Sequence, residues 1–171
     1  MLGETKQKVR MFLVDDHFII RQGIRHIFEA EPDFEVVGEA DNGEEAVRLA
    51  RQLSPDVIVM GARISRMNSV EATKRFKSQR LDASVLVLTS HDEENYIVEL
   101  LRAGAAGCLL KSADGEQLVQ VIRSISKGVL VLDPTVEHRI LNRVSKAQPL
   151  AIDFQNPPSN KKIFWVLGLL E

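Results

Sequence analysis

Cysteine is almost missing from this sequence, since Cys108 is the only one among its 171 residues. A single cysteine forms no intrachain disulfide, and such usage is typical of proteins from reducing compartments. Long apolar runs are missing as well. The polar start lacks the apolar core of a secretion signal, and Phe164–Leu170 is far too short to span a membrane. We therefore expect a cytoplasmic protein without membrane contact.

An excess of either charge is also missing. The chain has 22 Lys and Arg residues against 24 Asp and Glu residues, for a formal net charge of −2. This balance excludes a whole-chain attraction to nucleic acid or membrane. Aromatic residues make up only 5%, but the apolar share of 44% is enough for a proper core. The length predicts one soluble domain with an appendage.

Five short apolar runs alternate with segments of helical periodicity. Val57–Met60 is too short for a buried helix and is rich in β-branched residues, which favours a strand covered on both faces. In the first helical segment, Ile20, Ile24 and Ile27 fall on one stripe. Strict alternation predicts a doubly wound parallel sheet of the α/β class. The expected strands are Val9–Val14, Phe34–Ala40, Val57–Met60, Ser84–Leu88 and Gly107–Leu110.

Polar side chains, and one gap, follow four of these strands. Asp15 and Asp16 follow the first, Gly61 the third, Thr89 the fourth and Lys111 the fifth. Each of these alone is common on a protein surface. Because the carboxyl ends of parallel strands meet at one edge of the sheet, all five positions are expected to border one crevice.

The motifs around these positions resemble the receiver domain of bacterial response regulators, without a gap from Val9 to Gly128. The resemblance implies a flavodoxin-like fold with five strands in the order 2-1-3-4-5 and a role in two-component, phosphorelay-type signalling. Lys111-Ser112 without a proline, and the Gly128–Pro134 segment, resemble the LuxR/NarL-type branch. The motifs that carry the likeness are Leu13–His17, Pro55–Met60, Leu88–Ser90, Arg102–Gly107 and Leu109–Lys111.

The resemblance also assigns roles to the residues of the crevice. In that family an aspartate at the end of the third strand accepts a phosphoryl group from a histidine kinase, and two acidic residues after the first strand hold Mg²⁺. A threonine hydroxyl and a lysine ammonium then hold the phosphoryl oxygens. Asp15, Asp16, Thr89 and Lys111 match those four positions.

The acceptor itself departs from the pattern, because Gly61 stands at that position. Cys108 stands at the switch position, where the family has an aromatic residue, and the loop after the third strand lacks the frequent Met-Pro-x-Met-x-Gly pattern. Asp56 lies five residues back, about 16 Å away at about 3.3 Å per residue, and belongs at the opposite end of the sheet. Ser65 and Ser69 would need an activating base. We expect no phosphoacceptor and no catalytic residue.

A metal site is the least determined feature of the crevice. Mg²⁺ usually takes one or two carboxylates plus water, so Asp15 and Asp16 could hold it weakly. Alternatively, Lys111 pairs with one of the two aspartates and neutralises the pocket. No cofactor is required by either alternative. The histidines lack the spacing of zinc ligands: they are His17, His26, His91 and His138.

Three classes of function remain to be separated. The favoured hypothesis is an atypical, phosphorylation-independent receiver that docks a protein partner or forms a homodimer. The alternative is a DNA-binding transcriptional regulator of the LuxR type with a truncated output domain. A haloacid-dehalogenase-like phosphatase would need a second aspartate two places after Asp15, where His17 stands. The protein is therefore not expected to be an enzyme.

The domain organisation follows from the change in character after Lys127. Residues 9–128 are expected to form the receiver-like domain, 129–146 a linker segment and helix, and 147–171 a further linker with a degenerate or truncated helix-turn-helix remnant. Pro134 suits the first turn of the linker helix. Because base reading needs a recognition helix, which we do not find, specific DNA binding is not expected from this chain alone.

Overall fold

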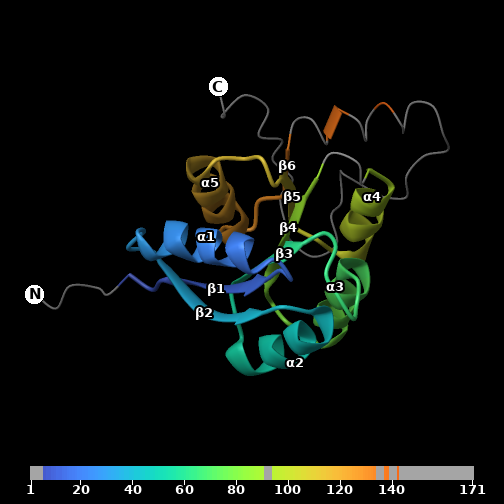
Figure 1. Cartoon of the computed structure of the whole chain (residues 1–171), viewed down its shortest axis with the longest axis horizontal. Coiled ribbons are helices and arrows are strands. Elements are labelled where there is room, and N and C mark those ends of the chain that lie inside the picture. The colour runs from blue at the N-terminus through green and yellow to red at the C-terminus, as the bar shows by residue number, and fades with distance from the viewer. Residues whose placement is uncertain (1–5, 91–93, 134–136, 139–141, 143–171) are drawn as a thin grey trace, which may run out of the picture.

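The computed structural model describes residues 6–90, 94–133, 137, 138 and 142 (Figure 1). Within this part of the chain, one sheet contains six parallel strands in the order β2-β1-β3-β4-β5-β6. The strands are β1 (Val9–Val14), β2 (Phe34–Ala40), β3 (Val57–Gly61), β4 (Ser84–Thr89), β5 (Gly107–Leu110) and β6 (Val131–Leu132).

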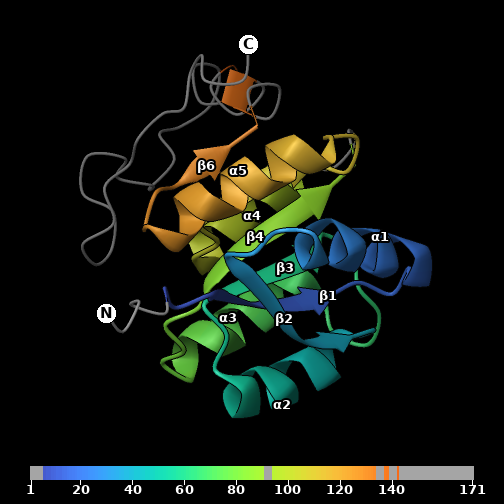
Figure 2. The ribbon, with the colours of Figure 1, turned by 90° about the vertical axis from the view of Figure 1, so that its left-hand side faces the viewer.

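Helices cover both faces of this sheet (Figure 2). Helices α1 and α5 pack on one face, and α2, α3 and α4 pack on the other. This is the doubly wound, flavodoxin-like arrangement that the alternating pattern predicted. The helices are α1 (Phe18–Glu29), α2 (Gly43–Leu53), α3 (Ser69–Ser78), α4 (Glu94–Ala103) and α5 (Gly115–Ser126).

The strand order reverses at β1, which fixes the position of the crevice. β1 pairs with β2 on one side and with β3 on the other, so the next two strands of the chain lie on opposite sides of β1. In an open α/β sheet, ligand sites lie beyond the carboxyl ends of the strands at such a switch point. The candidate residues of the sequence analysis follow these strand ends.

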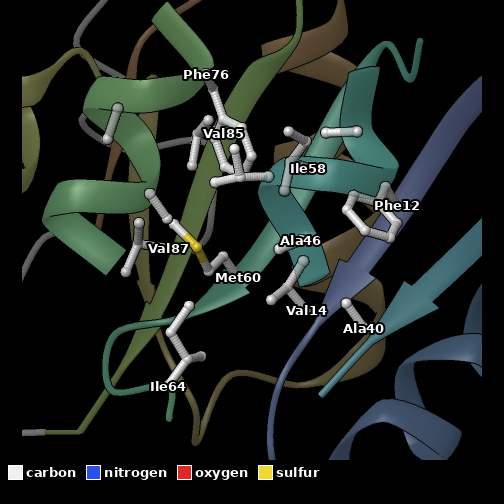
Figure 3. Close-up of a cluster of buried hydrophobic side chains, with 14 of the residues drawn as sticks. Phe12, Val14, Ala40, Ala46, Ile58, Met60, Ile64, Phe76, Val85 and Val87 are labelled. Atoms are coloured by element: carbon white, nitrogen blue, oxygen red, sulfur yellow. The ribbon is translucent and has the colours of Figure 1, made fainter. Parts of the chain in front are cut away.

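The core has two main layers because the central strands are buried on both faces. Along β1, Phe12 and Val14 pack toward α2 and α3, while Met11 and Leu13 pack toward α1 and α5. Figure 3 shows the first of these layers, in which Phe12 and Phe76 lie on either side of residues from β3 and β4. Alternating burial with period two is what a covered strand requires.

Local signals fix where several helices begin and end. The Asn42 side chain accepts a hydrogen bond from the Glu45 backbone N–H at 2.9 Å at the start of α2. Asn68 does the same for Glu71 at the start of α3, at 2.9 Å. Asp114 and Gln117 form a reciprocal capping box at the start of α5.

The expectation of five strands was wrong by one. Val131–Leu132 pairs in parallel with β5, through hydrogen bonds from Val131 N to Ala106 O (3.1 Å) and from Asp133 N to Cys108 O (2.9 Å). A strand of two residues is too short to show a periodic pattern in the sequence, and it is stabilised by its pairing with β5. The predicted linker helix beginning at Pro134 lies largely outside the described residues, and the tail from 147 onward lies entirely outside them. Among the helices within them, none has the length and apolar composition needed to cross a membrane.

Candidate functional site

The carboxyl ends of four strands bring the candidate residues together. Asp15 follows β1, Gly61 ends β3, Thr89 ends β4 and Lys111 follows β5. Asp15 and Thr89 are buried, at 2% and 0% exposure, whereas Lys111 is accessible. Backbone hydrogen bonds hold these ends in register, from Asp15 N to Ala40 O (3.2 Å) and from Lys111 N to Thr89 O (2.8 Å).

The Asp15 carboxylate has two different environments. Its Oδ1 atom accepts a hydrogen bond from the His17 backbone N–H at 2.8 Å and lies 2.9 Å from His17 Nδ1. Its Oδ2 atom is buried and has no hydrogen-bond partner among the described residues. The Lys111 Nζ atom lies 3.5 Å from Oδ2. This distance corresponds to an ion pair that is longer than a hydrogen bond.

The Asp15 carboxylate also fills the space beside Gly61. A Cβ atom built on Gly61 would lie 2.7 Å from Asp15 Oδ2 and 3.3 Å from Asp15 Cγ. The Arg63 carbonyl oxygen borders the same space, 3.6 Å from that Cβ position. Two oxygen atoms therefore line the place where a side chain at residue 61 would begin.

His17 lies between the two aspartates, and the sequence analysis missed this role. Its Nδ1 atom is 2.9 Å from Asp15 Oδ1 and 3.0 Å from Asp16 Oδ1, while the imidazole is 63% exposed. The three side chains each offer a ligand atom, and these atoms lie within 4.8 Å of one another. The available signal was its position directly after the Asp-Asp pair; in the structure His17 is the N-cap residue of α1.

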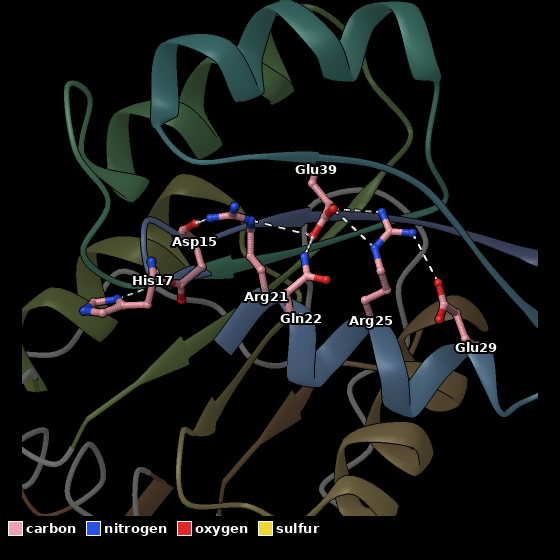
Figure 4. Close-up of polar contacts among 7 residues, drawn as sticks. All are labelled: Asp15, His17, Arg21, Gln22, Arg25, Glu29 and Glu39. Carbon is pink, nitrogen blue, oxygen red and sulfur yellow. Dashed lines mark hydrogen bonds and ion pairs between the residues drawn. The ribbon is translucent and has the colours of Figure 1, made fainter. Parts of the chain in front are cut away.

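A charged network supports the first strand end from the side of α1 (Figure 4). Arg21 Nη1 donates to the Asp15 carbonyl oxygen, and Arg21 Nε lies 3.6 Å from Glu39 Oε1. Arg25 Nη2 donates to Glu39 Oε2 at 2.9 Å. Burial lowers the pKa of Arg25, but hydrogen bonds and charge from Glu39 and Glu29 together outweigh it, so the net pKa is raised. The network ties α1 to β2 and fixes the backbone at Asp15.

Tyr96 connects α4 to the segment that follows Gly61. The Tyr96 hydroxyl accepts from the backbone N–H groups of Ser69 (3.0 Å) and Val70 (3.4 Å), the first two residues of α3. Ser69 Oγ lies 3.0 Å from the same hydroxyl and donates to the carbonyl oxygen of Ala62. Since a hydroxyl has one proton to give, Tyr96 donates to Ser69. A residue of α4 thus completes the N-terminal cap of α3.

Cys108, at the predicted switch position, is buried at 2% exposure. It lies on β5 in a small apolar cluster with Ile97 and Val98 of α4 and Leu132 of β6. The structure thus places Cys108 as a packing residue beneath α4. The predicted site residues therefore form a polar group at the strand ends, while Cys108 lies apart from them in an apolar cluster under α4.

A shallow groove and an exposed apolar pair lie beside the crevice. The groove runs between α1 and α5 and is lined by residues including Ile20, Ile27 and Leu118, with Lys111 also on its lining. Phe18 and Ile19, at the start of α1, are 65% and 83% exposed. Large apolar side chains so accessible and adjacent are typical of contact surfaces.

Comparison with known proteins places this geometry in a family context. Residues 11–123 match the family described as "Response regulator receiver domain". The chain is 37% identical over 137 residues to the transcriptional regulatory protein DegU of Brevibacillus brevis, covering 80% of this chain and 58% of that protein. It is 40% identical over 136 residues to the transcriptional regulatory protein LiaR of Bacillus subtilis, covering 80% of this chain and 64% of that protein. The chain thus spans less than two thirds of the length of these two relatives.

A solved structure gives the same picture in three dimensions. The crystal structure of a two-component response regulator of the LuxR family from Aurantimonas sp. SI85-9A1 superposes with a TM-score of 0.76 at 34% sequence identity. The match covers 81% of this chain and 99% of that chain.

Proposed function

The chain belongs to the response regulator receiver domain family, and from this premise we propose that it acts as a phosphorylation-independent receiver. Its family role is two-component signalling, and relatives such as DegU and LiaR are transcriptional regulators. The proposal is that this receiver domain signals by docking a protein partner or a second copy of itself. It carries out no catalysis.

The observation that carries the proposal is the Asp15 carboxylate beside Gly61. The family's phosphoacceptor is an aspartate at the end of the third strand, and this chain has no side chain there. Asp15 Oδ2 lies 2.7 Å from the position of the missing Cβ atom. Phosphoryl transfer depends on positioning a nucleophile in line with the phosphorus atom. The buried Asp15 carboxylate fills that space and pairs with Lys111. The pocket therefore presents no nucleophile to solvent.

The candidate substitutes for the acceptor are engaged elsewhere. Asp56 precedes β3 at the opposite edge of the sheet, where its Oδ2 atom accepts from the Arg10 backbone N–H at 2.8 Å. Ser69 is buried and its hydroxyl donates to Ala62. Ser65 is exposed, and its hydroxyl contacts the Asp41 carbonyl oxygen at 3.4 Å. A serine hydroxyl needs a neighbouring base to become a nucleophile, and these contacts are to carbonyl oxygens.

The family's Mg²⁺ chemistry is retained only in part. Asp15 and Asp16 match the positions that hold the ion, and Asp15 Oδ2 is a buried oxygen without a hydrogen-bond donor among the described residues. Mg²⁺ accepts one or two carboxylates with water in the remaining positions, so these residues fit weak binding. The ion would neutralise charge at the strand ends, while Lys111 already contributes one positive charge there.

The surface that favours protein docking lies at the start of α1. Phe18 and Ile19 are the exposed large apolar residues in the described part of the chain, and they directly precede Ile20, which lines the groove between α1 and α5. Burying two such side chains in a partner is favourable by about 1.5–3 kcal/mol each. This surface needs no covalent change in the pocket in order to be exposed.

A beryllofluoride titration followed by NMR tests the proposal. BeF₃⁻ mimics a phosphoryl group by bonding to the acceptor carboxylate. With a Mg²⁺-only spectrum as the reference, we expect BeF₃⁻ to leave the amide shifts of β3–β5 unchanged. The variant Gly61→Asp supplies the missing carboxylate and is expected to respond. Widespread, saturable shifts in the unmodified protein would refute the proposal.

A further inference from the structure

The groove between α1 and α5 extends well beyond the end that Lys111 borders. A second hollow between the same helices shares Ile27 and Gly115 with the first and continues as far as Arg123. The floor of the groove is apolar, because it lies over the core cluster that α1, α5 and the strands form. The apolar side chains along its length include Ile20, Ile24, Ile27, Leu109, Leu118 and Val119.

Two glycines keep this groove open. A Cβ atom built on Gly23 would have no neighbour within 4 Å, and one built on Gly115 would lie 3.1 Å from the side chain of Ile27. Glycine is unfavourable in the middle of a helix, but it lets another segment approach the helix backbone closely. Ile19, which is 83% exposed, lies one turn before Gly23 on the same side of α1. The exposed apolar surface at the start of α1 therefore continues into the groove.

The sequence contains an apolar segment of matching chemistry outside the described residues. Ile163–Leu170 has eight residues and no charged side chain, and it carries Phe164 and Trp165 near its start. Aromatic side chains of this size gain most from burial, and a continuous apolar stretch is unfavourable in water. The segment therefore needs an apolar surface to cover, and the groove needs an apolar occupant.

The chain leaves the described sheet close to the groove. The Asp133 backbone N–H, directly after β6, donates to the carbonyl oxygen of Cys108 at 2.9 Å, three residues before Lys111. Residues 134–162 then lead to the apolar segment, and a coil of about 30 residues has an average end-to-end distance of roughly 30 Å. Helix α5, one wall of the groove, has 12 residues and is about 18 Å long. The segment can thus reach the groove of its own chain, where the tether keeps its effective concentration high.

The charges beside the groove and beside the segment are complementary. Asp114 and Glu116 are exposed on the rim of the groove. The rim cations Lys111 and Arg123 already pair with carboxylates, at 3.5 Å and 2.9 Å. The rim thus keeps an excess of negative charge, and Lys161-Lys162 directly precede the apolar segment. Opposite charges of this kind favour one orientation of a docked segment.

We propose that Ile163–Leu170 docks into the groove between α1 and α5 of its own chain and competes there with a protein partner. The competition rests on the proposed function, because it concerns the surface to which partner docking is assigned. Phe18 and Ile19 directly precede the groove residue Ile20, so a segment in the groove borders the partner's site. A partner then binds only after the segment leaves, and its apparent affinity falls with the fraction of molecules whose groove is open.

Trp165 reports on this docking, because it is the only tryptophan of the chain. Its fluorescence emission and its quenching by acrylamide are measured in the unmodified full chain and in the variants Gly23→Leu and Lys74→Leu. The leucine at residue 23 extends into open space beside α1 and fills the groove. Lys74→Leu is the control, because it adds the same side chain at an exposed position of α3, on the opposite face of the sheet.

We expect blue-shifted emission and weak quenching of Trp165 in the unmodified protein and in the control, at every protein concentration. Gly23→Leu should shift the emission to the red and raise the quenching constant severalfold. A nitroxide label on Ser159→Cys gives a second readout by NMR, since the native Cys108 is buried and should stay unlabelled. The label is expected to broaden the methyl signals of the groove residues and to leave those of α2 unchanged.

Freely quenched Trp165 in the unmodified protein would overturn the inference, as would protection that Gly23→Leu leaves intact. Unbroadened methyl signals in the groove would also refute it. Protection that grows with protein concentration would contradict docking within one chain, because the segment would then lie on a second copy. None of these results touches the beryllofluoride test, which decides the proposed function separately.

Discussion

Asp15 is the residue whose position determines the chemistry of the pocket. One of its carboxylate oxygens faces His17, and the other lies where a side chain of residue 61 would begin. Arg21 binds its carbonyl oxygen, so the backbone at this strand end is held by α1. A substitution at residue 61 is therefore expected to act through Asp15.

Gly61→Ala tests this expectation by adding a single methyl group at residue 61. The new Cβ atom would lie 2.7 Å from Asp15 Oδ2, so the carboxylate must turn away and lose its contact with Lys111. Overpacking of this kind typically costs about 1–3 kcal/mol. We expect a loss of unfolding free energy in this range by urea denaturation, and a smaller loss in an Asp15→Ala background.

Gly23→Ala is the matched control for this substitution. Its Cβ atom would have no neighbour within 4 Å, and the residue is exposed within α1. Alanine is better than glycine in a helix by about 1 kcal/mol, so this variant should be more stable than the unmodified protein. Equal effects of the two substitutions, or an Asp15→Ala background without influence, would contradict the described position of Asp15.

At the scale of the elements, the sequence predicted a large share of the structure. The strands β1 to β5 and the helices between them follow from apolar runs and helical stripes, each of which is a local signal. The short strand β6 was missed because two residues carry no periodicity and pair only when the β5 edge is already present.

Local sequence patterns could not predict the contacts between elements that are distant in the chain. The sequence suggested that Asp15 and Lys111 border one crevice, but it could not indicate that Asp15 turns toward Gly61 or that His17 bridges two carboxylates. Such side-chain directions depend on the packing of the strand ends. Tyr96, which caps α3 from a position 27 residues farther along the chain, is another contact of this kind.

Removing the Tyr96 hydroxyl should loosen the link between α3 and α4. In Tyr96→Phe the backbone N–H groups of Ser69 and Val70 lose their acceptor, and Ser69 Oγ loses its donor. Leaving buried donors unpaired costs about 1–3 kcal/mol. We expect destabilisation in this range, together with faster hydrogen exchange at the amides of residues 69 and 70.

Ser78→Ala is the control, because its hydroxyl bonds the Arg75 carbonyl oxygen in an exposed position at the end of α3. It should leave both stability and exchange at the start of α3 nearly unchanged. If Tyr96→Phe behaves like this control, the hydroxyl is not a cap and α4 is not coupled to the segment after Gly61.

At the scale of the whole molecule, an ion-pair cluster joins the far end of α5 to the turn before β2. Arg123 Nε donates to Asp33 Oδ2 at 2.9 Å, and Arg123 Nη2 donates to Glu31 Oε2 at 2.8 Å. The hydrogen bond from Arg123 is the main cause that lowers the pKa of Asp33 below its ordinary value of 3.8. The same bond raises the pKa of Arg123.

This cluster predicts a specific dependence of stability on pH. A carboxylate whose pKa is lower in the folded state stabilises the protein above the unfolded value, and this contribution is lost as pH falls through the folded value. Because 31% of the Asp33 side chain and 40% of the Arg123 side chain are exposed, the effect is expected to be about 1 kcal/mol or less. Asp33→Asn should therefore be less stable than the unmodified protein at pH 7, and the difference should shrink below about pH 4. A difference that stays constant between pH 7 and pH 3, measured by urea denaturation, would refute the pairing.

The claim that this receiver works without a phosphoacceptor is tested most directly by intact-mass measurement after incubation with acetyl phosphate and Mg²⁺. Gly61→Asp is treated in parallel, so that one carboxylate at the end of β3 is the only difference between the samples. We predict that the unmodified protein keeps its mass, because Gly61 offers no nucleophile and Asp15 is buried against Lys111. A stoichiometric, acid-labile gain of one phosphoryl group on the unmodified protein would contradict the account.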